Sequence, residues 1–153
     1  MIVYRLTKSD FKEDISGSGA KINGSRWNSK GMPMLFTAEH ISLATLEMLV
    51  HINFVEIPNS LYLLNISLPE TSTISEIKIN SLKTSWRNDE DYTSFIGDQF
   101  LLQNNVLFLK VPSAVIKEES NFIINPIHKD FSNVKIIKSE LFEFDKRFFS
   151  PHE

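Results

Sequence analysis

Apolar side chains along the chain fall into short runs separated by polar segments, and the length and composition of each run predict its structure. Glu39–Phe54 is the clearest helix, because it holds no Gly or Pro, contains Leu, Ala and Met, and ends before Pro58. A second helix is predicted over Asp91–Gln103. Short β-prone runs predict strands over Met1–Leu6, Met34–Ala38, Leu61–Leu68, Val106–Val111, Asn121–Ile124 and Val134–Phe144.

The predicted helices and strands are mixed without regular β–α–β alternation. This order favours the α+β class over a doubly wound α/β fold. A chain of 153 residues has the usual size of one globular domain, so we expect a single domain over residues 1–153. Residues 70–90 are polar and mixed, and no element is assigned to them. The chain shows no internal repeat and no heptad pattern.

Charge and composition exclude several classes of function. The net charge is −3 and no run of Lys or Arg is present, so direct binding of nucleic acid is not expected. The absence of Cys removes disulfides, cysteine nucleophiles and thiolate metal sites, and without an H-E-x-x-H arrangement no metal site is expected. The chain begins without a signal-peptide pattern and lacks a membrane-length apolar run, so we expect a soluble cytoplasmic protein that does not bind membranes.

Glu47 is the most informative single residue, because it interrupts a helix that is apolar on most sides. Its helical neighbours include Leu43, Ala44 and Val50. A carboxylate held against the core is costly unless it is paired, and such carboxylates often belong to functional sites. The alternative is an edge position where Glu47 pairs with a nearby Arg or Lys, and spacing alone leaves both interpretations open.

Four of the five glycines lie in Ser16–Gly31, which marks backbone that turns tightly or approaches something closely. Arg26 lies in this segment, followed by Trp27 and Asn28. A guanidinium there could grip phosphate through two parallel hydrogen bonds. The alternative is a surface arginine stacked on Trp27. Arg5, at the end of an apolar strand, carries a weaker form of the same argument.

Ser113 follows Pro112 at the end of a predicted strand. A serine at this place could donate to a phosphate or a sugar hydroxyl, although most such serines cap a turn. The chain has no G-x-S-x-G sequence, so we do not expect a serine hydrolase.

The order of these segments closely resembles the RES domain, a family named for an Arg, a Glu and a Ser. The resemblance runs from Tyr4 to about Arg147, and its most specific parts are Gly24–His51 and Val111–Phe131. It is carried by VYR, GSGAKINGSRWNSKGMPMLFTAEHISLATLEMLVH, IGDQF, VPSAVIKEESNFIINPIHKDF and FEFDKRF.

Carried over position by position, the family's arginines correspond to Arg5 and Arg26, its glutamate to Glu47 and its serine to Ser113. Many members have Tyr where this chain has Phe36, so the hydroxyl of that ring is missing here. The resemblance implies a fold similar to ADP-ribosyltransferase toxins, with a split, mainly antiparallel β core, surrounding helices and an NAD⁺ cleft.

The resemblance also implies an activity and partners. The protein would be the toxin of a type II toxin–antitoxin pair that degrades NAD⁺ by hydrolysis or phosphorolysis. NAD⁺ would be its substrate, with no cofactor and no metal. Its protein partner would be an Xre-type helix-turn-helix antitoxin, with self-association in the complex left open. Two alternatives remain: transfer of ADP-ribose to a protein, and an inactive binding module, which the loss of Tyr at Phe36 would fit.

Cleavage of the nicotinamide–ribose bond assigns each residue a role. A carboxylate stabilises the oxocarbenium-like charge on the ribose, guanidiniums and small donors hold the pyrophosphate, and an aromatic face stacks on the cationic nicotinamide. The predicted catalytic residues are Glu47 and Arg26, and the predicted substrate-binding residues are Arg5, Ser113, Phe36, Tyr4, Trp27 and Asn28.

Overall fold

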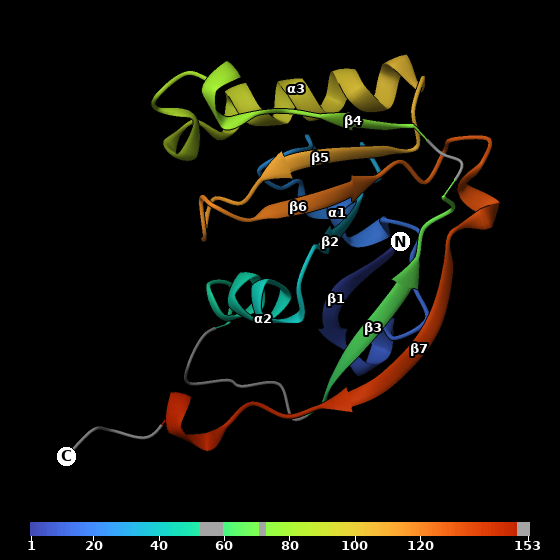
Figure 1. The fold of residues 1–153 in the computed structure, drawn as a ribbon, viewed down its shortest axis with the longest axis vertical. Helices are drawn as coiled ribbons and strands as arrows, with labels where there is room; N and C mark the ends of the chain where they lie inside the picture. Colours follow the sequence, from blue (N-terminus) through green and yellow to red (C-terminus); the bar gives the residue numbers. More distant parts are fainter. Residues whose placement is uncertain (53–59, 71–72, 150–153) are drawn as a thin grey trace.

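The computed structural model describes residues 1–52, 60–70 and 73–149. Figure 1 shows a strongly twisted sheet with helices packed against it. The sheet has seven strands in the order β4-β5-β6-β2-β1-β3-β7. These strands are β1 (Ile2–Lys8), β2 (Leu35–Ala38), β3 (Leu61–Ser67), β4 (Ile74–Glu76), β5 (Phe108–Pro112), β6 (Ser120–Ile124) and β7 (Lys135–Phe142).

The sheet is nearly divided into two halves between β1 and β2. These neighbouring strands are joined by one registered pair, Tyr4 with Ala38, whereas β1 pairs with β3 along its whole length. Every registered pairing is antiparallel except that of β4 with β5. The predicted α+β class and split, mainly antiparallel core are therefore confirmed.

Three α-helices accompany the sheet: α1 (Ser18–Asn23), α2 (Ile41–Leu49) and α3 (Glu90–Gln103). The second predicted helix agrees with α3 to within one residue, and Asp89 caps it by accepting a hydrogen bond from the Tyr92 amide at 2.9 Å. No helix in the described part of the chain is long and apolar enough to cross a bilayer.

Two helices depart from the sequence prediction. The helix predicted to reach Phe54 ends at Leu49, and positions 53 and 54 lie outside the described residues. Helix α1 was not predicted, because a glycine lies at each of its ends. Gly17 and Gly24 adopt positive φ angles of 74° and 68° there. Glycine adopts these angles at little cost, so a glycine can end a helix as well as belong to a loop.

Both faces of the sheet bury apolar side chains. On one face Val3, Leu35 and Leu64 belong to the first core cluster. On the other face Leu109 and Ile123 pack with Trp27 of the glycine-rich segment and with apolar residues of α3. The glycine-rich segment is therefore held between the sheet and α3.

Backbone contact between α3 and the glycine-rich segment is unusually close at Gly97. A Cβ atom there would lie 1.8 Å from the carbonyl oxygen of Trp27. The next residue, Asp98, accepts a hydrogen bond from the Ser29 amide at 3.0 Å. Gly97 permits the close approach, and the hydrogen bond of Asp98 links α3 to the glycine-rich segment. Because this segment carries Arg26, the two contacts help to position Arg26.

Gly97→Ala is expected to lower the free energy of unfolding by about 1–3 kcal/mol, the usual cost of forcing extra volume into a packed interior. Gly19→Ala is the matched control, because Gly19 also lies in a helix and a Cβ there meets nothing within 4 Å. The control is expected to be neutral or to stabilise by about 0.4–1 kcal/mol. Urea denaturation of both variants measures the difference, and equal stabilities would show that the contact does not constrain the fold.

Candidate functional site

Glu47 of α2 is hydrogen-bonded to the strands beside it. Its Oε1 accepts the hydroxyl of Ser113 at 2.8 Å and the side-chain amide of Asn121 at 2.6 Å. Ser113 directly follows β5, and Asn121 lies in β6. The glutamate and the serine that the sequence singled out, 66 positions apart, thus lie together. Among the described residues the hydrogen-bond partners of Glu47 are Ser113 and Asn121, and neither is an Arg or a Lys.

The hydroxyl of Ser113 has its hydrogen-bonding capacity fully used. Ser113 is completely buried, and its Oγ accepts the backbone amides of Val115 and Ile116 at 3.0 Å each. A hydroxyl has one donor hydrogen and two acceptor lone pairs, so the remaining hydrogen is directed to Glu47. Ser113 therefore caps a turn and positions the carboxylate at once, instead of presenting a free hydroxyl.

Asn121 is a site residue that sequence reasoning missed. Its Nδ2 donates to Glu47, and its Oδ1 is buried with no hydrogen-bond partner among the described residues. An unpaired buried acceptor costs roughly 1–3 kcal/mol, so this oxygen offers a place for a donor from a ligand. The only local signal was a polar side chain at the start of an apolar β-strand, which is too common to select it.

Tyr4 and Phe36 lie on the same face of the sheet as Asn121. Ala38 is directly opposite both Tyr4 and Asn121, and Phe36 is two residues from Ala38 along β2, so all four side chains emerge on one face. Tyr4 packs against the apolar cluster that seats α2, and Phe36 packs against the cluster that contains Trp27. Two predicted aromatic residues thus share a face with the predicted carboxylate.

Arg5 emerges on the opposite face of β1 from Tyr4, because successive side chains of a strand alternate. Its partner in β3 is Leu64 of the first core cluster. Beyond Tyr4, β1 has no registered partner in β2, so Arg5 lies where the two half-sheets separate. The structure therefore does not group Arg5 with Arg26.

Burial shapes the electrostatics around Arg5. Its Nε is buried with no hydrogen-bond partner among the described residues. Burial lowers the pKa of Arg5, and the negative charge of Asp14 acts in the opposite direction. Hydrogen bonds from Ser16 and Ser18, together with the charge of Arg5, hold the pKa of Asp14 below its ordinary value. Arg5 is thus a half-buried cation whose buried Nε has no hydrogen-bond partner among the described residues.

Arg26 is linked to the site through Arg87, a second residue that sequence reasoning missed. Arg26 Nη1 donates to the main-chain oxygen of Arg87 at 2.7 Å, and its Nη2 lies 3.6 Å from the exposed carboxylate of Glu90. Arg87 Nη2 in turn donates to the main-chain oxygen of Ala114, the residue after Ser113. Two guanidiniums therefore connect the glycine-rich segment to the turn that holds Glu47. Arg87 lay in the unassigned segment, where no pattern distinguished it.

Trp27 and Asn28 are buried. The Trp27 ring packs against Trp86, with ring centroids 6.0 Å apart. The Asn28 amide donates to the main-chain oxygens of Ala20 and Met32 at 2.8 Å each. Both residues hold the segment that carries Arg26, and direct contact with a substrate stays a prediction for them.

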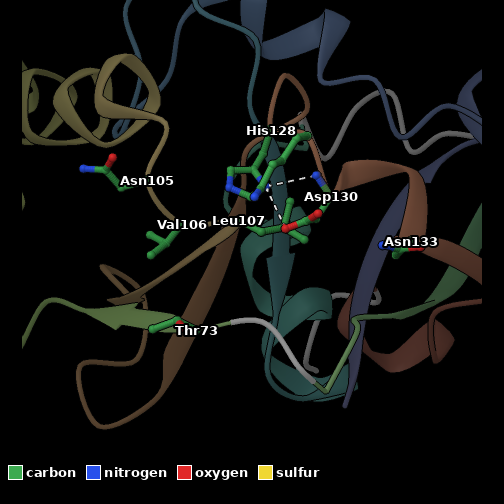
Figure 2. Close-up of a pocket in the computed structure, with 8 residues that line it drawn as sticks. Thr73, Asn105, Val106, Leu107, His128, Asp130 and Asn133 are labelled. Atoms are coloured by element: carbon green, nitrogen blue, oxygen red, sulfur yellow. Dashed lines mark hydrogen bonds and ion pairs between the residues drawn. The ribbon is translucent and has the colours of Figure 1, made fainter.

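The pocket in Figure 2 does not belong to this site. It has a volume of roughly 270 Å³ and lies at the start of β5, where Figure 2 shows His128 and Asp130 pointing toward each other. Ser113 lies at the other end of β5, about 15–20 Å away at 3.3 Å per residue. None of the sequence-predicted site residues lines this pocket. Its lining residues are Thr73, Asn105, Val106, Leu107, His128, Lys129, Asp130 and Asn133.

A second pocket, of roughly 370 Å³, lies at the Glu47 end of β5 and β6. It is bordered by Pro112 and Ser120, a registered pair whose side chains emerge on the opposite face of the sheet from Asn121, and none of the predicted site residues lines it. No described residue hydrogen-bonds Oε2 of Glu47. Among the described residues, no group of three or more His, Asp and Glu could hold a metal ion. The chemistry available here is that of a positioned carboxylate with nearby guanidiniums.

Comparison with known proteins gives concordant results. The chain matches the RES domain family over residues 2–145. It is 38% identical over 151 residues to Toxin Res of Photorhabdus laumondii, covering 96% of each chain. It is 34% identical over 139 residues to the Prs ADP-ribosylating toxin of a Sphingobium species, covering 88% of this chain and 86% of that one.

The fold also has a counterpart among solved structures. The crystal structure of the M. tuberculosis MbcT–MbcA toxin–antitoxin complex contains a chain that is similar with a TM-score of 0.77 at 14% identity, over 92% of this chain and 83% of that one. At this identity the likeness concerns the fold alone. Taken with the family match over nearly the whole length, it leads to one conclusion: this chain belongs to the RES domain family.

Proposed function

We propose that this protein is a toxin that cleaves the bond between nicotinamide and ribose in NAD⁺, with Glu47 as the catalytic carboxylate. The observation that carries the proposal is the geometry of Glu47: Ser113, just after β5, and Asn121 of β6 both donate to its Oε1, while no described residue donates to its Oε2. A carboxylate fixed in this way is preorganised for a positive charge that develops in a transition state.

The reaction places that charge on the ribose. The C–N bond to nicotinamide breaks, its electron pair leaves with neutral nicotinamide, and an oxygen of the acceptor forms the new bond to the same carbon as its proton is lost to solvent. The carboxylate of Glu47 stabilises the intervening oxocarbenium-like cation. The buried Oδ1 of Asn121 is suited to accept a hydrogen bond from a ribose hydroxyl or from the nicotinamide amide.

The pyrophosphate of NAD⁺ requires cations, and the chain offers Arg26 and Arg87 beside the Ser113 turn. Each guanidinium carries five donors, of which Arg26 and Arg87 spend few on the protein. The contact of Arg26 with Glu90 is a solvent-exposed ion pair, a type worth roughly 0–1 kcal/mol, so a phosphate can displace it. Arg5 is a third cation at the separation of the half-sheets, on the opposite face of β1 from Tyr4, and its buried Nε has no partner among the described residues.

A second candidate function differs only in the acceptor. A relative at 34% identity is named as an ADP-ribosylating toxin of Prs, which favours transfer of ADP-ribose to a protein as the alternative to water or phosphate. The same residues would cleave the same bond. Product analysis separates these routes: free ADP-ribose indicates hydrolysis, a phosphorylated ADP-ribose formed only with phosphate indicates phosphorolysis, and modified protein indicates transfer.

Glu47→Gln is expected to lower the rate of nicotinamide release from NAD⁺ by a factor on the order of 10²–10³, because the isosteric amide removes the stabilising charge. Glutamine can still accept from Ser113 and Asn121, so the fold is retained. Glu118→Gln, an exposed glutamate on the β5–β6 turn, is the matched control and should leave the rate unchanged. Near wild-type turnover by Glu47→Gln would overturn the assignment, and no release by the wild type would favour an inactive binding module.

Arg26→Ala and Arg87→Ala are each expected to weaken NAD⁺ binding about 10- to 100-fold, the loss of one charge-assisted hydrogen-bonding group. Arg26→Lys should restore part of the affinity, because a point charge cannot reproduce the planar fork. Glu90→Gln removes the competing carboxylate and should preserve or strengthen binding. Calorimetric titration on folded variants tests this set. If Ala, Lys and wild type bind alike, Arg26 serves only to hold its loop.

We also propose a cognate antitoxin of the Xre type, in line with the toxin–antitoxin complex that the MbcT fold belongs to. Expression of the chain alone in the cytoplasm should lower cellular NAD⁺ and stop growth, and co-expression of the neighbouring reading frame should reverse both. Because the toxin is acidic, any DNA binding should reside in the partner. Unchanged NAD⁺ in cells that contain folded protein would contradict the proposal.

A further inference from the structure

Strand β7 forms one edge of the sheet, and its outer side is open. β7 follows β3 at the end of the strand order, and no described residue pairs with its other edge (Figure 1). It is one of the longest strands, with eight residues. An open edge of this length presents unpaired N–H and C=O groups that can receive another strand.

The sequence of this edge is symmetric in residue type about Ser139, with opposite charges beside it and apolar residues further out. Lys138 and Glu140 stand on either side of it, and Ile137 and Leu141 stand one step further out. Both of these apolar side chains are 55% exposed, although β-strands usually turn large apolar groups inward. In an antiparallel pair of identical strands centred on Ser139, each Lys138 faces a Glu140 and each Ile137 faces a Leu141.

The regular part of the strand covers all of this symmetric segment except its first residue, Ile137. Lys138, Ser139 and Glu140 are in continuous register with β3, and the register shift falls beyond Lys138, so that Ile137 has no registered partner in β3. Further out the symmetry ends, because Ile136 packs into the first core cluster and Phe142 into another. The segment available for pairing is therefore 137–141.

The charges on this edge are not arranged to repel a second copy, although the register shift at Ile137 limits the regular edge to residues 138–142. Natural proteins commonly block sheet edges with charges, and a row of like charges repels a second copy of itself. Here the two charges have opposite signs and are placed so that a second copy meets them with the complementary sign. Within one chain they already attract, with Lys138 Nζ 2.8 Å from Glu140 Oε2. This edge repels neither its own copy nor its own side chains.

We propose that β7 is a self-association surface, and that a second copy of this chain adds its own β7 antiparallel to it about a two-fold axis through Ser139. Such an interface uses the same patch on both subunits, as a two-fold dimer requires. It extends the half-sheet β1-β3-β7 across the dimer. It buries Ile137 and Leu141 against their mates and leaves β5, β6 and α2, which carry the candidate site, uncovered. The proposal does not depend on the activity of the protein.

Charge exchange tests the pairing on the full-length chain, in a Glu47→Gln background that avoids toxicity. Sedimentation over a concentration series should show a dimer. Lys138→Glu and Glu140→Lys should each weaken its dissociation constant roughly tenfold or more, because like charges then face each other twice per interface. The double variant Lys138→Glu/Glu140→Lys should restore dimerisation. Lys117→Glu, the same charge change on the β5–β6 turn, is the control and should leave the dimer intact.

Cross-linking provides a second test, because the chain contains no Cys. Ser139→Cys places one thiol at the two-fold axis, where two copies face each other at disulfide distance, so mild oxidation should give a covalent dimer that reductant reverses. Ser132→Cys, an exposed serine outside the sheet, should cross-link poorly. A wild-type chain that stays monomeric, single charge variants that dimerise like wild type, or a double variant that is not rescued would overturn the proposal, as would equal cross-linking at the two positions.

Discussion

The hydrogen bonds to Oε1 of Glu47 are the constraint on which the arrangement of the site depends. Glu47 is half-buried, and removing a carboxylate even partly from water is costly unless it is hydrogen-bonded, which Ser113 and Asn121 provide. Because the Ser113 hydroxyl accepts two backbone amides, its hydrogen has one direction left, toward Glu47. Helix α2 is thereby fixed against β5 and β6, and the carboxylate is held before any ligand arrives.

A second constraint brings the arginines to the same place. The absence of a side chain at Gly97 lets α3 contact the backbone of Trp27 directly, and Trp27 in turn packs on Trp86. These contacts place Arg26 beside Arg87, whose guanidinium reaches the residue after Ser113. Cations from the glycine-rich segment and from the 3-10 turn Trp86–Asn88 thus converge on the strand end that carries the serine.

Elements with a strong local signal were predicted well, and those defined by their neighbours were not. Helix α3 was found almost residue for residue, since it combines a side-chain cap with an uninterrupted run of 14 residues. Strand β4 was missed because its three residues are all exposed and gain their structure only by pairing with β5. Helix α1 was not predicted, because the glycines at its two ends also favour loops.

The sequence by itself determined the α+β class and the limits of most strands, and it selected Glu47 and Ser113 as candidate site residues, because periodicity, helix propensity and family motifs are properties of neighbouring residues. Only the tertiary structure decided which distant residues meet. It placed Glu47 on Ser113 and Asn121, turned Arg5 to the opposite face of β1, and brought Arg87 to the site. Contacts across 66 and 74 positions depend on strand register and on the packing of helices, which no local pattern encodes.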